Sequence, residues 1–178
     1  MPGALTAAIL CGWSGTVGGV RVTRHRYTVE GWGVGELIVA GDLVLAHDLP
    51  DPAVADDGVD DDTALTRRIT ARVRDHLTGA ETDYADLELD LSWCTDFQRE
   101  LARALRAVPW GEIVSYGELA ALAGRPGAAR AAGTFCAHNR FALVLPCHRV
   151  VSATGIGGYG TSGVGLKRRL LTLEGVEL

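Results

Sequence analysis

The feature that most constrains the fold is a succession of short helix signals in residues 95–139. "TDFQ" and "SYGE" each place a threonine or serine three residues before a glutamine or glutamate. This is the capping-box pattern, so helices are expected to begin after Thr95 and Ser115. Pro109 ends the first helix, and the turn "RPG" leads from the second into a third over 128–139. Two short helices joined by a tight turn predict a helix-turn-helix, a motif that often binds DNA but also occurs in αα-hairpins that bind nothing.

The chain ahead of this block has a different character. Residues 1–25 are rich in Gly, Ala and Thr without a clear period, and we expect a loose leader there. Alternating apolar positions broken by glycines then indicate a small antiparallel sheet. The expected elements are strands within 26–49 and over 84–93, an acidic exposed loop over 50–63, and a helix over 64–79. We therefore predict an N-terminal α/β domain over 26–92 and a second domain over 93–178.

The composition is that of a folded, cytoplasmic protein. Of 178 residues, 47% are hydrophobic and 22% charged, which suits a core-forming domain. No apolar stretch is long enough to span a membrane, and no basic residue precedes the short apolar patch at the start, as a secretory signal would require. The four cysteines, Cys11, Cys94, Cys136 and Cys147, form no CxxC pair, so we expect reduced thiols rather than disulfides or a zinc ribbon.

The charge is divided unevenly along the chain. Residues 1–100 hold 8 arginines against 18 acidic residues, whereas residues 101–178 hold 9 basic residues against 4 acidic ones. A basic half suits an anionic partner such as nucleic acid. A chance imbalance on a solvated surface is the alternative.

Two charged residues of the second block stand out. Arg130 is alone among alanines and glycine in the third helix, where small side chains let a partner approach and an arginine can pair with phosphate or stack on a base. The alternative is a tightly packed core helix with Arg130 at its rim. Glu174 lies in the last turn of the C-terminal helix, where the helix dipole disfavours an acid. Either Glu174 has an electrostatic task elsewhere or it is an exposed residue without a role.

The run "VLPCHRVV", residues 144–151, poses the question of whether Cys147 is a packed core thiol or a nucleophile. "PCHRVV" with a helix-turn-helix upstream resembles the O6-alkylguanine-DNA alkyltransferases, and the similarity runs from about Trp93 to Gly175. The spacing agrees with that family's pattern. Tyr116, Arg130 and Asn139 lie 31, 17 and 8 residues before Cys147, and Glu174 lies 27 after it.

The resemblance implies a fold and an activity. The fold is a small N-terminal α/β domain, ribonuclease-H-like, followed by a helical, winged helix-turn-helix-like domain. The activity is direct-reversal DNA repair, in which an alkyl group moves irreversibly from O6-alkylguanine to Cys147. The resemblance leaves open whether O4-alkylthymine is also a substrate. Each molecule would act once, as a monomer on double-stranded DNA and without a cofactor.

The resemblance also implies roles for individual residues. Cys147 is the alkyl acceptor, His148 draws off its proton through a water, and Glu174 orients that imidazole. Asn139 is the hinge that ties the recognition helix to the active-site turn. Tyr116 crowds the phosphate and protonates the leaving guanine, and Arg130 fills the stack that the flipped base vacates. The remaining predicted contacts are Ala129, Gly133 and Arg140 to DNA, and Tyr159, Gly160 and Val150 in the base pocket.

Some positions depart from the family pattern. Arg140 stands where the family has proline, Phe135 where it often has a small residue, and the loop of Tyr159 is one residue shorter than in some relatives. Potential zinc ligands in the first half have a spacing that fits no known site, so we predict no metal; they are Cys11, His25, His47 and His76.

Three other functions would use the same residues differently. A lesion-binding protein that recruits excision repair without transferring the alkyl group is the main alternative, although such relatives lack the cysteine. A transcriptional regulator would leave the Cys-His-Glu spacing unexplained. A Cys-His hydrolase would require an oxyanion hole, and the sequence has no signature of one.

Overall fold

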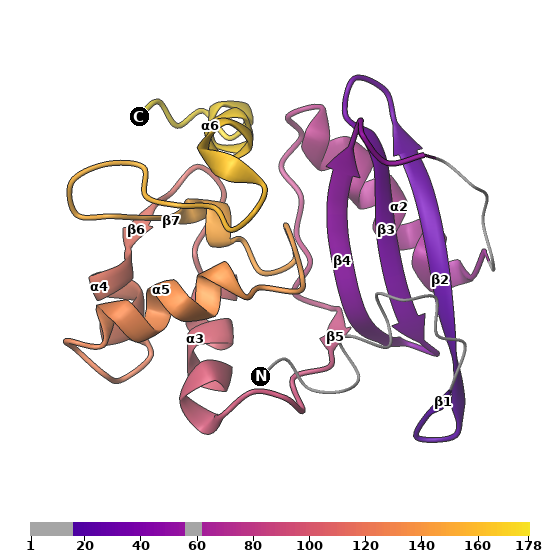
Figure 1. Cartoon of the computed structure of the whole chain (residues 1–178), viewed down its shortest axis with the longest axis horizontal. Coiled ribbons are helices and arrows are strands. Elements are labelled where there is room, and N and C mark those ends of the chain that lie inside the picture. The colour runs from indigo at the N-terminus through magenta and orange to yellow at the C-terminus, as the bar shows by residue number, and fades with distance from the viewer. Residues whose placement is uncertain (1–15, 56–61) are drawn as a thin grey trace. The chain divides into compact units, whose positions relative to one another are not determined.

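The computed structural model describes residues 16–55 and 62–178 (Figure 1). These residues form a curled five-stranded sheet and five α-helices, so the prediction of a mixed α/β chain is confirmed. The chain divides into two compact units. One contains the residues up to Ile69 together with Leu87–Trp93, and the other contains Thr70–Asp86 and Cys94–Leu178.

The first unit is built on the sheet. Its strands follow chain order as β1 (Thr16–Val17), β2 (Val20–Val29), β3 (Gly33–Ala40), β4 (Leu43–Asp51) and β5 (Glu88–Leu89). The first four strands pair antiparallel, and β5 lies parallel to β4. Alternation along the strands gathers Val22, Ile38 and Leu45 into one buried cluster. Only two residues of the strand expected over 84–93 are paired.

The predicted leader overlaps the sheet. β2 begins at Val20, so residues 20–25 belong to a strand, and His25 within it is buried. Residues 1–15, including Cys11, lie outside the described residues.

The helix expected over 64–79 is α2, Ala64–Leu77. Its four apolar positions are all buried, as their spacing predicted; they are Leu65, Ile69, Val73 and Leu77. The boundary between the two units falls inside this helix, after Ile69. Its last turn, which carries the fully buried His76, belongs to the second unit.

The second unit contains the short helices. They are α3 (Asp96–Arg106), α4 (Tyr116–Leu122), α5 (Ala129–Ala137) and α6 (Gly163–Leu173). Both capping boxes are confirmed, because Thr95 and Ser115 each cap a helix and each exchanges hydrogen bonds with the residue three positions on. α4 packs against α5 and α3 contacts both, which brings the two helices of the predicted helix-turn-helix together (Figure 1).

The apolar run "FALVLP", residues 141–146, predicts a buried strand from its sequence, but the structure forms a buried turn there. Leu143 adopts a left-handed φ of 64°, and the Leu145 amide donates to the Phe141 carbonyl at 2.8 Å. The Asn139 side chain closes this turn by accepting from the Phe141 amide and donating to the Leu145 carbonyl. Side-chain hydrogen bonds of this kind compete with strand pairing for the backbone groups.

The turn leads directly into the segment that contains Cys147. A 3₁₀ turn, Cys147–Arg149, is followed by β7 (Val150–Val151), which pairs in parallel with β6 (Val114–Ser115). None of the helices in the described ranges has both the length and the apolar character that crossing a membrane requires.

Candidate active site

Cys147 lies at the start of the 3₁₀ turn, directly after Pro146, and is buried. Its Sγ accepts a hydrogen bond from Asn139 Nδ2 at 3.0 Å. The same amide nitrogen donates to the Leu145 carbonyl at 2.8 Å. Asn139 therefore connects the residues that follow α5 directly to the thiol, in the position that the sequence assigned to the hinge.

The resting thiol of Cys147 is protonated. Burial raises the pKa of Cys147, and this outweighs the opposing effects of the Asn139 hydrogen bond, the nearby Lys167 ammonium and the Tyr159 hydroxyl. A thiol is a weak nucleophile and the thiolate a strong one, so reaction at this sulfur requires a base.

His148, the next residue, is the candidate base. Its Nε2 lies 2.8 Å from Glu174 Oε1, and both side chains are fully buried. His148 Nδ1 is buried without a hydrogen-bond partner among the described residues. With the ring proton on Nε2 donated to Glu174, Nδ1 is left as an acceptor for a proton. Burial lowers the pKa of His148 to about 4, although Glu174 opposes this, so the imidazole is neutral at pH 7.

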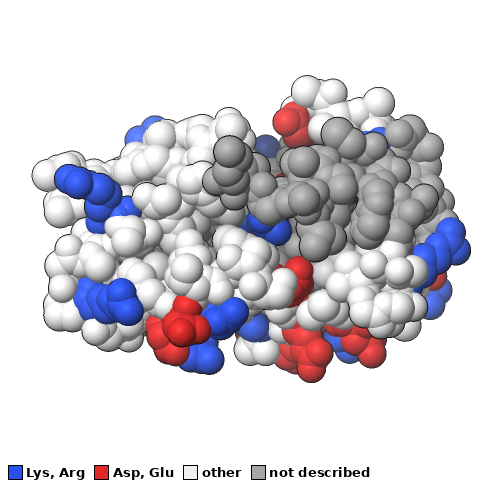
Figure 2. Space-filling model, turned by 60° about the horizontal axis from the view of Figure 1, so that its bottom comes forward, with Lys and Arg blue, Asp and Glu red and all other residues white. Residues whose placement is uncertain are grey.

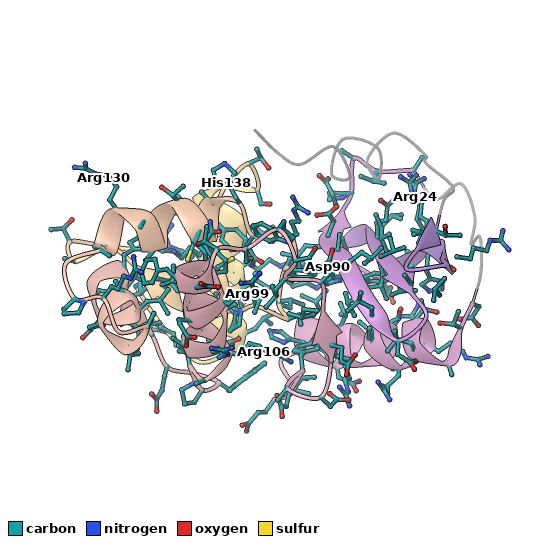
Figure 3. The ribbon with its side chains drawn as sticks, turned by 90° about the horizontal axis from the view of Figure 1, so that it is seen from below. Arg24, Asp90, Arg99, Arg106, Arg130 and His138 are labelled. Atoms are coloured by element: carbon teal, nitrogen blue, oxygen red, sulfur yellow. The ribbon has the colours of Figure 1, made fainter. Side chains whose placement is uncertain are left out.

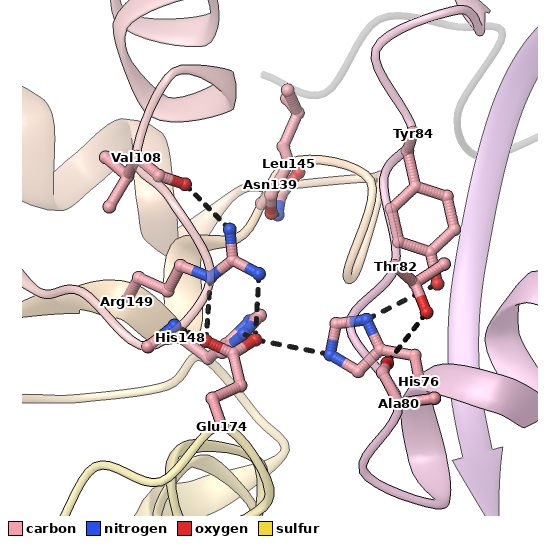
Figure 4. A network of polar contacts seen from close by, with 11 residues as sticks. His76, Ala80, Thr82, Tyr84, Val108, Asn139, Leu145, His148, Arg149 and Glu174 are labelled. Atoms are coloured by element: carbon pink, nitrogen blue, oxygen red, sulfur yellow. Dashed lines mark hydrogen bonds and ion pairs between the residues drawn. The ribbon is translucent and has the colours of Figure 1, made fainter.

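Glu174 caps the C-terminal end of α6, and its unfavourable place at that end is offset by several donors (Figure 4). Arg149 binds both carboxylate oxygens, with Nε 2.8 Å from Oε2 and Nη2 2.9 Å from Oε1. His76 Nε2 lies 3.3 Å from Oε1. Burial alone would raise the pKa of Glu174, but the hydrogen bonds from His148 and Arg149 and the nearby His76 imidazole hold it well below its usual range. The carboxylate is therefore charged.

His76, His148 and Glu174 also offer three atoms of metal-binding type within 4.8 Å of one another. However, the Arg149 guanidinium already binds both oxygens of the one carboxylate. A metal ion would have to share that carboxylate with a buried cation, at a distance where like charges repel strongly. We therefore interpret the cluster of His76, His148 and Glu174 as a set of proton donors and acceptors and not as a metal site.

A pocket of about 160 Å³ opens onto Cys147. It is lined by Tyr116, Gly133, Cys136, Ala137, Cys147, Gly158, Tyr159 and Gly160. Val150, predicted for this pocket, does not line it; it is fully buried, and its carbonyl accepts from Lys167 Nζ. The other two predicted pocket residues, Tyr159 and Gly160, are among its walls.

Tyr116 occupies one wall of the pocket, and a glycine makes room for it. At Gly157 φ is +72°, and an added Cβ would lie 3.1 Å from the Ser152 amide nitrogen and 3.3 Å from the Tyr116 ring. Glycine suits this conformation and this close approach, because an added Cβ would crowd both neighbours. The Gly157 position thus keeps the Tyr116 side chain against the loop that faces Cys147.

Two residues, one beside the pocket and one in its wall, escaped the sequence analysis as functional candidates. Lys167 is fully buried, and its ammonium donates to the Val150 and Gly158 carbonyls. It therefore ties α6 to the pocket loop and favours the thiolate of Cys147. Cys136 is a second thiol in the same pocket. No sequence pattern near Lys167 or Cys136 marks either residue, because only the fold brings them close to Cys147.

The predicted DNA-contacting residues cluster on α5 and just after it. Arg130 is exposed and projects from the helix (Figure 3), whereas Ala129 and Arg140 are half-buried. Ala132 on the same helix is fully buried, so the small residues also serve packing. On the face drawn in Figure 2, charges of both signs are scattered rather than gathered into one basic band.

We expect the buried His148 to make the folded state sensitive to acid. The unfolded chain binds a proton at this residue below about pH 6.5, but the folded chain does so only below about pH 4. Because the unfolded state then holds more protons, stability falls as the pH is lowered between these values. The loss should reach roughly 3 kcal/mol. Urea unfolding from pH 7 to pH 4 measures it, and His148→Asn should flatten this part of the profile.

The fold and the site together define a class of protein. It is an α/β protein with a packed pair of short helices and a pocket that opens onto a buried cysteine, and the residue after this cysteine is a histidine held by a carboxylate. Residues 96–176 match the family model of the 6-O-methylguanine DNA methyltransferase DNA-binding domain. The chain is 43% identical over 129 residues to the methylated-DNA–protein-cysteine methyltransferase of Mycobacterium tuberculosis, covering 72% of this chain and 70% of the relative.

Solved structures agree with the sequence comparisons. The M. tuberculosis OGT in complex with DNA has a TM-score of 0.71 and 36% identity, over 85% of this chain and 91% of that one. The O6-methylguanine-DNA methyltransferase of Pyrococcus kodakaraensis has a TM-score of 0.54 and 26% identity, over 87% and 99%. The chain belongs to the methylated-DNA–protein-cysteine methyltransferase family, as the resemblance predicted.

Proposed function

We propose that this chain repairs alkylated DNA by direct reversal, moving the alkyl group from O6 of guanine to Cys147 in a single turnover. The observation that carries the proposal is the arrangement of Cys147 on a base-sized pocket beside the buried His148–Glu174 pair. The M. tuberculosis relative was solved in complex with DNA, which supports DNA as the partner. The lesion-binding alternative is not favoured, because the thiol and its base are both present.

The chemistry follows from the placement of protons. The Cys147 proton passes through a water to the free Nδ1 of His148, and the sulfur attacks the alkyl carbon. The bond between that carbon and O6 breaks, and its electron pair stays with guanine, which takes a proton. Tyr116 is the donor in the pocket wall, since burial raises the pKa of Tyr116 and keeps it protonated. A thioether does not hydrolyse under mild conditions, so the protein acts once.

The target atom is hidden inside a duplex, so the base must be flipped into the pocket. Arg130, exposed on α5, is the side chain that would fill the vacated stack, and Tyr116 would crowd the phosphate. Ala129, Gly133 and Arg140 would lie against the DNA backbone. These roles, a winged form of the helix-turn-helix, a ribonuclease-H-like first domain and monomeric action on O6-alkylguanine are parts of the proposal.

The test uses a duplex that contains one O6-methylguanine. The protein is expected to gain the mass of one methylene group, confined to the peptide that carries Cys147 and stopping at one per molecule. An unmodified duplex should produce no mass change. Binding of the methylated duplex without any mass gain would refute alkyl transfer and favour the lesion-binding alternative.

A further inference from the structure

A second histidine, His76, contacts the same carboxylate oxygen as His148. Its Nε2 lies 3.3 Å from Glu174 Oε1, and its ring meets the His148 ring edge-on with centroids 5.9 Å apart. The imidazole is fully buried and packs edge-on against Trp110 at 4.7 Å. It belongs to the last turn of α2, far from the PCHRV motif in sequence.

The tautomer of His76 follows from its other neighbour. The Tyr84 hydroxyl lies 3.5 Å from His76 Nδ1, and burial raises the pKa of Tyr84, so this group is a hydroxyl donor (Figure 4). With Nδ1 as the acceptor, Nε2 carries the proton and lies 3.3 Å from Glu174 Oε1, in a close contact without regular hydrogen-bond geometry. The buried chain therefore runs from Tyr84 through His76 and Glu174 to His148.

We propose that His76 is a positioning residue of the alkyl-transfer site, which fixes Glu174 Oε1 between two imidazoles and so limits how strongly that carboxylate holds a proton on His148. This inference rests on the proposed function. Glu174 Oε1 accepts hydrogen bonds from His148 and Arg149 and lies 3.3 Å from the His76 imidazole nitrogen. Each of these groups is attracted to the negative charge of the Glu174 carboxylate. Removing one of them therefore strengthens the interaction of the carboxylate with the others.

The direction of the effect follows from the groups around His148. They are the Glu174 carboxylate, the Arg149 guanidinium and the His76 imidazole, with Tyr84 behind His76. Loss of the His76 donor strengthens the pull of Glu174 on a His148 proton. The protonated, inactive form of His148 then persists to a higher pH, and the acid limb of the transfer rate moves with it.

The experiment compares His76→Leu, which removes the donor, with His76→Gln, which keeps an N–H. Single-turnover rates on the methylated duplex are measured from pH 4 to pH 8, and the His148 imidazole is titrated by NMR without DNA. For His76→Leu we expect the midpoint of the His148 titration and the acid limb of the rate profile to move up by about one pH unit. The transfer rate at the lowest pH values then falls about tenfold relative to wild type. At pH 8 the two rates should agree within about threefold, and His76→Gln should stay near wild type.

His47→Leu is the matched control, because His47 is also a fully buried histidine bonded to a tyrosine hydroxyl, that of Tyr27 in the sheet. It should lose stability and leave both pH profiles unchanged. The proposal is overturned if His76→Leu keeps the wild-type His148 titration, or if His47→Leu shifts the rate profile equally. A wild-type protein that transfers nothing would defeat the proposed function, while the NMR titration would still decide the role of His76.

Discussion

Replacing Cys147 by serine is expected to abolish alkyl transfer, whereas replacing Cys136 by serine leaves it close to wild type. Both thiols line the same pocket, so they meet the same substrate. They differ in their neighbours, since Cys147 directly precedes His148 of the buried pair in the chain and accepts a hydrogen bond from Asn139. Burial, reinforced by Cys147, raises the pKa of Cys136 to about 12, so that thiol stays protonated.

The measurement is the single-turnover rate with methyl transfer located by peptide mass. Cys147→Ser should slow transfer by more than about 10³-fold, since a hydroxyl is a far weaker acid and nucleophile than a thiol. Cys136→Ser should change the rate by less than about threefold. Methyl groups found on Cys136 in the Cys147→Ser protein would contradict this reading, because proximity to the pocket alone would then suffice for reaction.

The sequence predicted local structure correctly where both partners of an interaction lie within a few residues of each other. The capping boxes at Thr95 and Ser115 are of this kind. The strand expected at "FALVLP" was wrong for a related reason. Its apolar letters indicate burial, which is correct, but the Asn139 side chain takes the backbone groups that a neighbouring strand would have used.

The residues of the site could be predicted from the sequence only where they match the family pattern. The motif led to Cys147, His148 and Glu174, and the structure brings His148 and Glu174 into contact. It did not indicate His76, since a histidine in the last turn of α2 has no local feature that relates it to Glu174. The sequence had also left Glu174 as either an electrostatic residue or an idle one. Its burial against the His148 and His76 imidazoles and the Arg149 guanidinium decides in favour of the electrostatic role.

Arg149 lies inside the PCHRV motif, and its removal is expected to have the largest effect on stability. It binds both oxygens of Glu174, donates to the Val108 carbonyl at 2.7 Å, and stacks 5.8 Å above the Trp110 ring. Arg149→Met fills similar space but leaves a buried carboxylate without its cation. Breaking a buried pair in this way costs about 3–5 kcal/mol, which urea unfolding at pH 7 would measure.

Arg99→Met is the matched control, because it removes the same side chain from an exposed pair. Arg99 contacts Asp96 at 2.7 Å on the surface of α3, where the Asp96 side chain is 99% exposed (Figure 3). Solvent screens such a pair, so the loss should stay below about 1 kcal/mol. Equal losses in the two variants would mean that the Arg149–Glu174 pair contributes no more than a surface contact. A large loss for Arg149→Met alone, growing as the pH rises and Glu174 ionises, would identify the charge left on Glu174 as its cause.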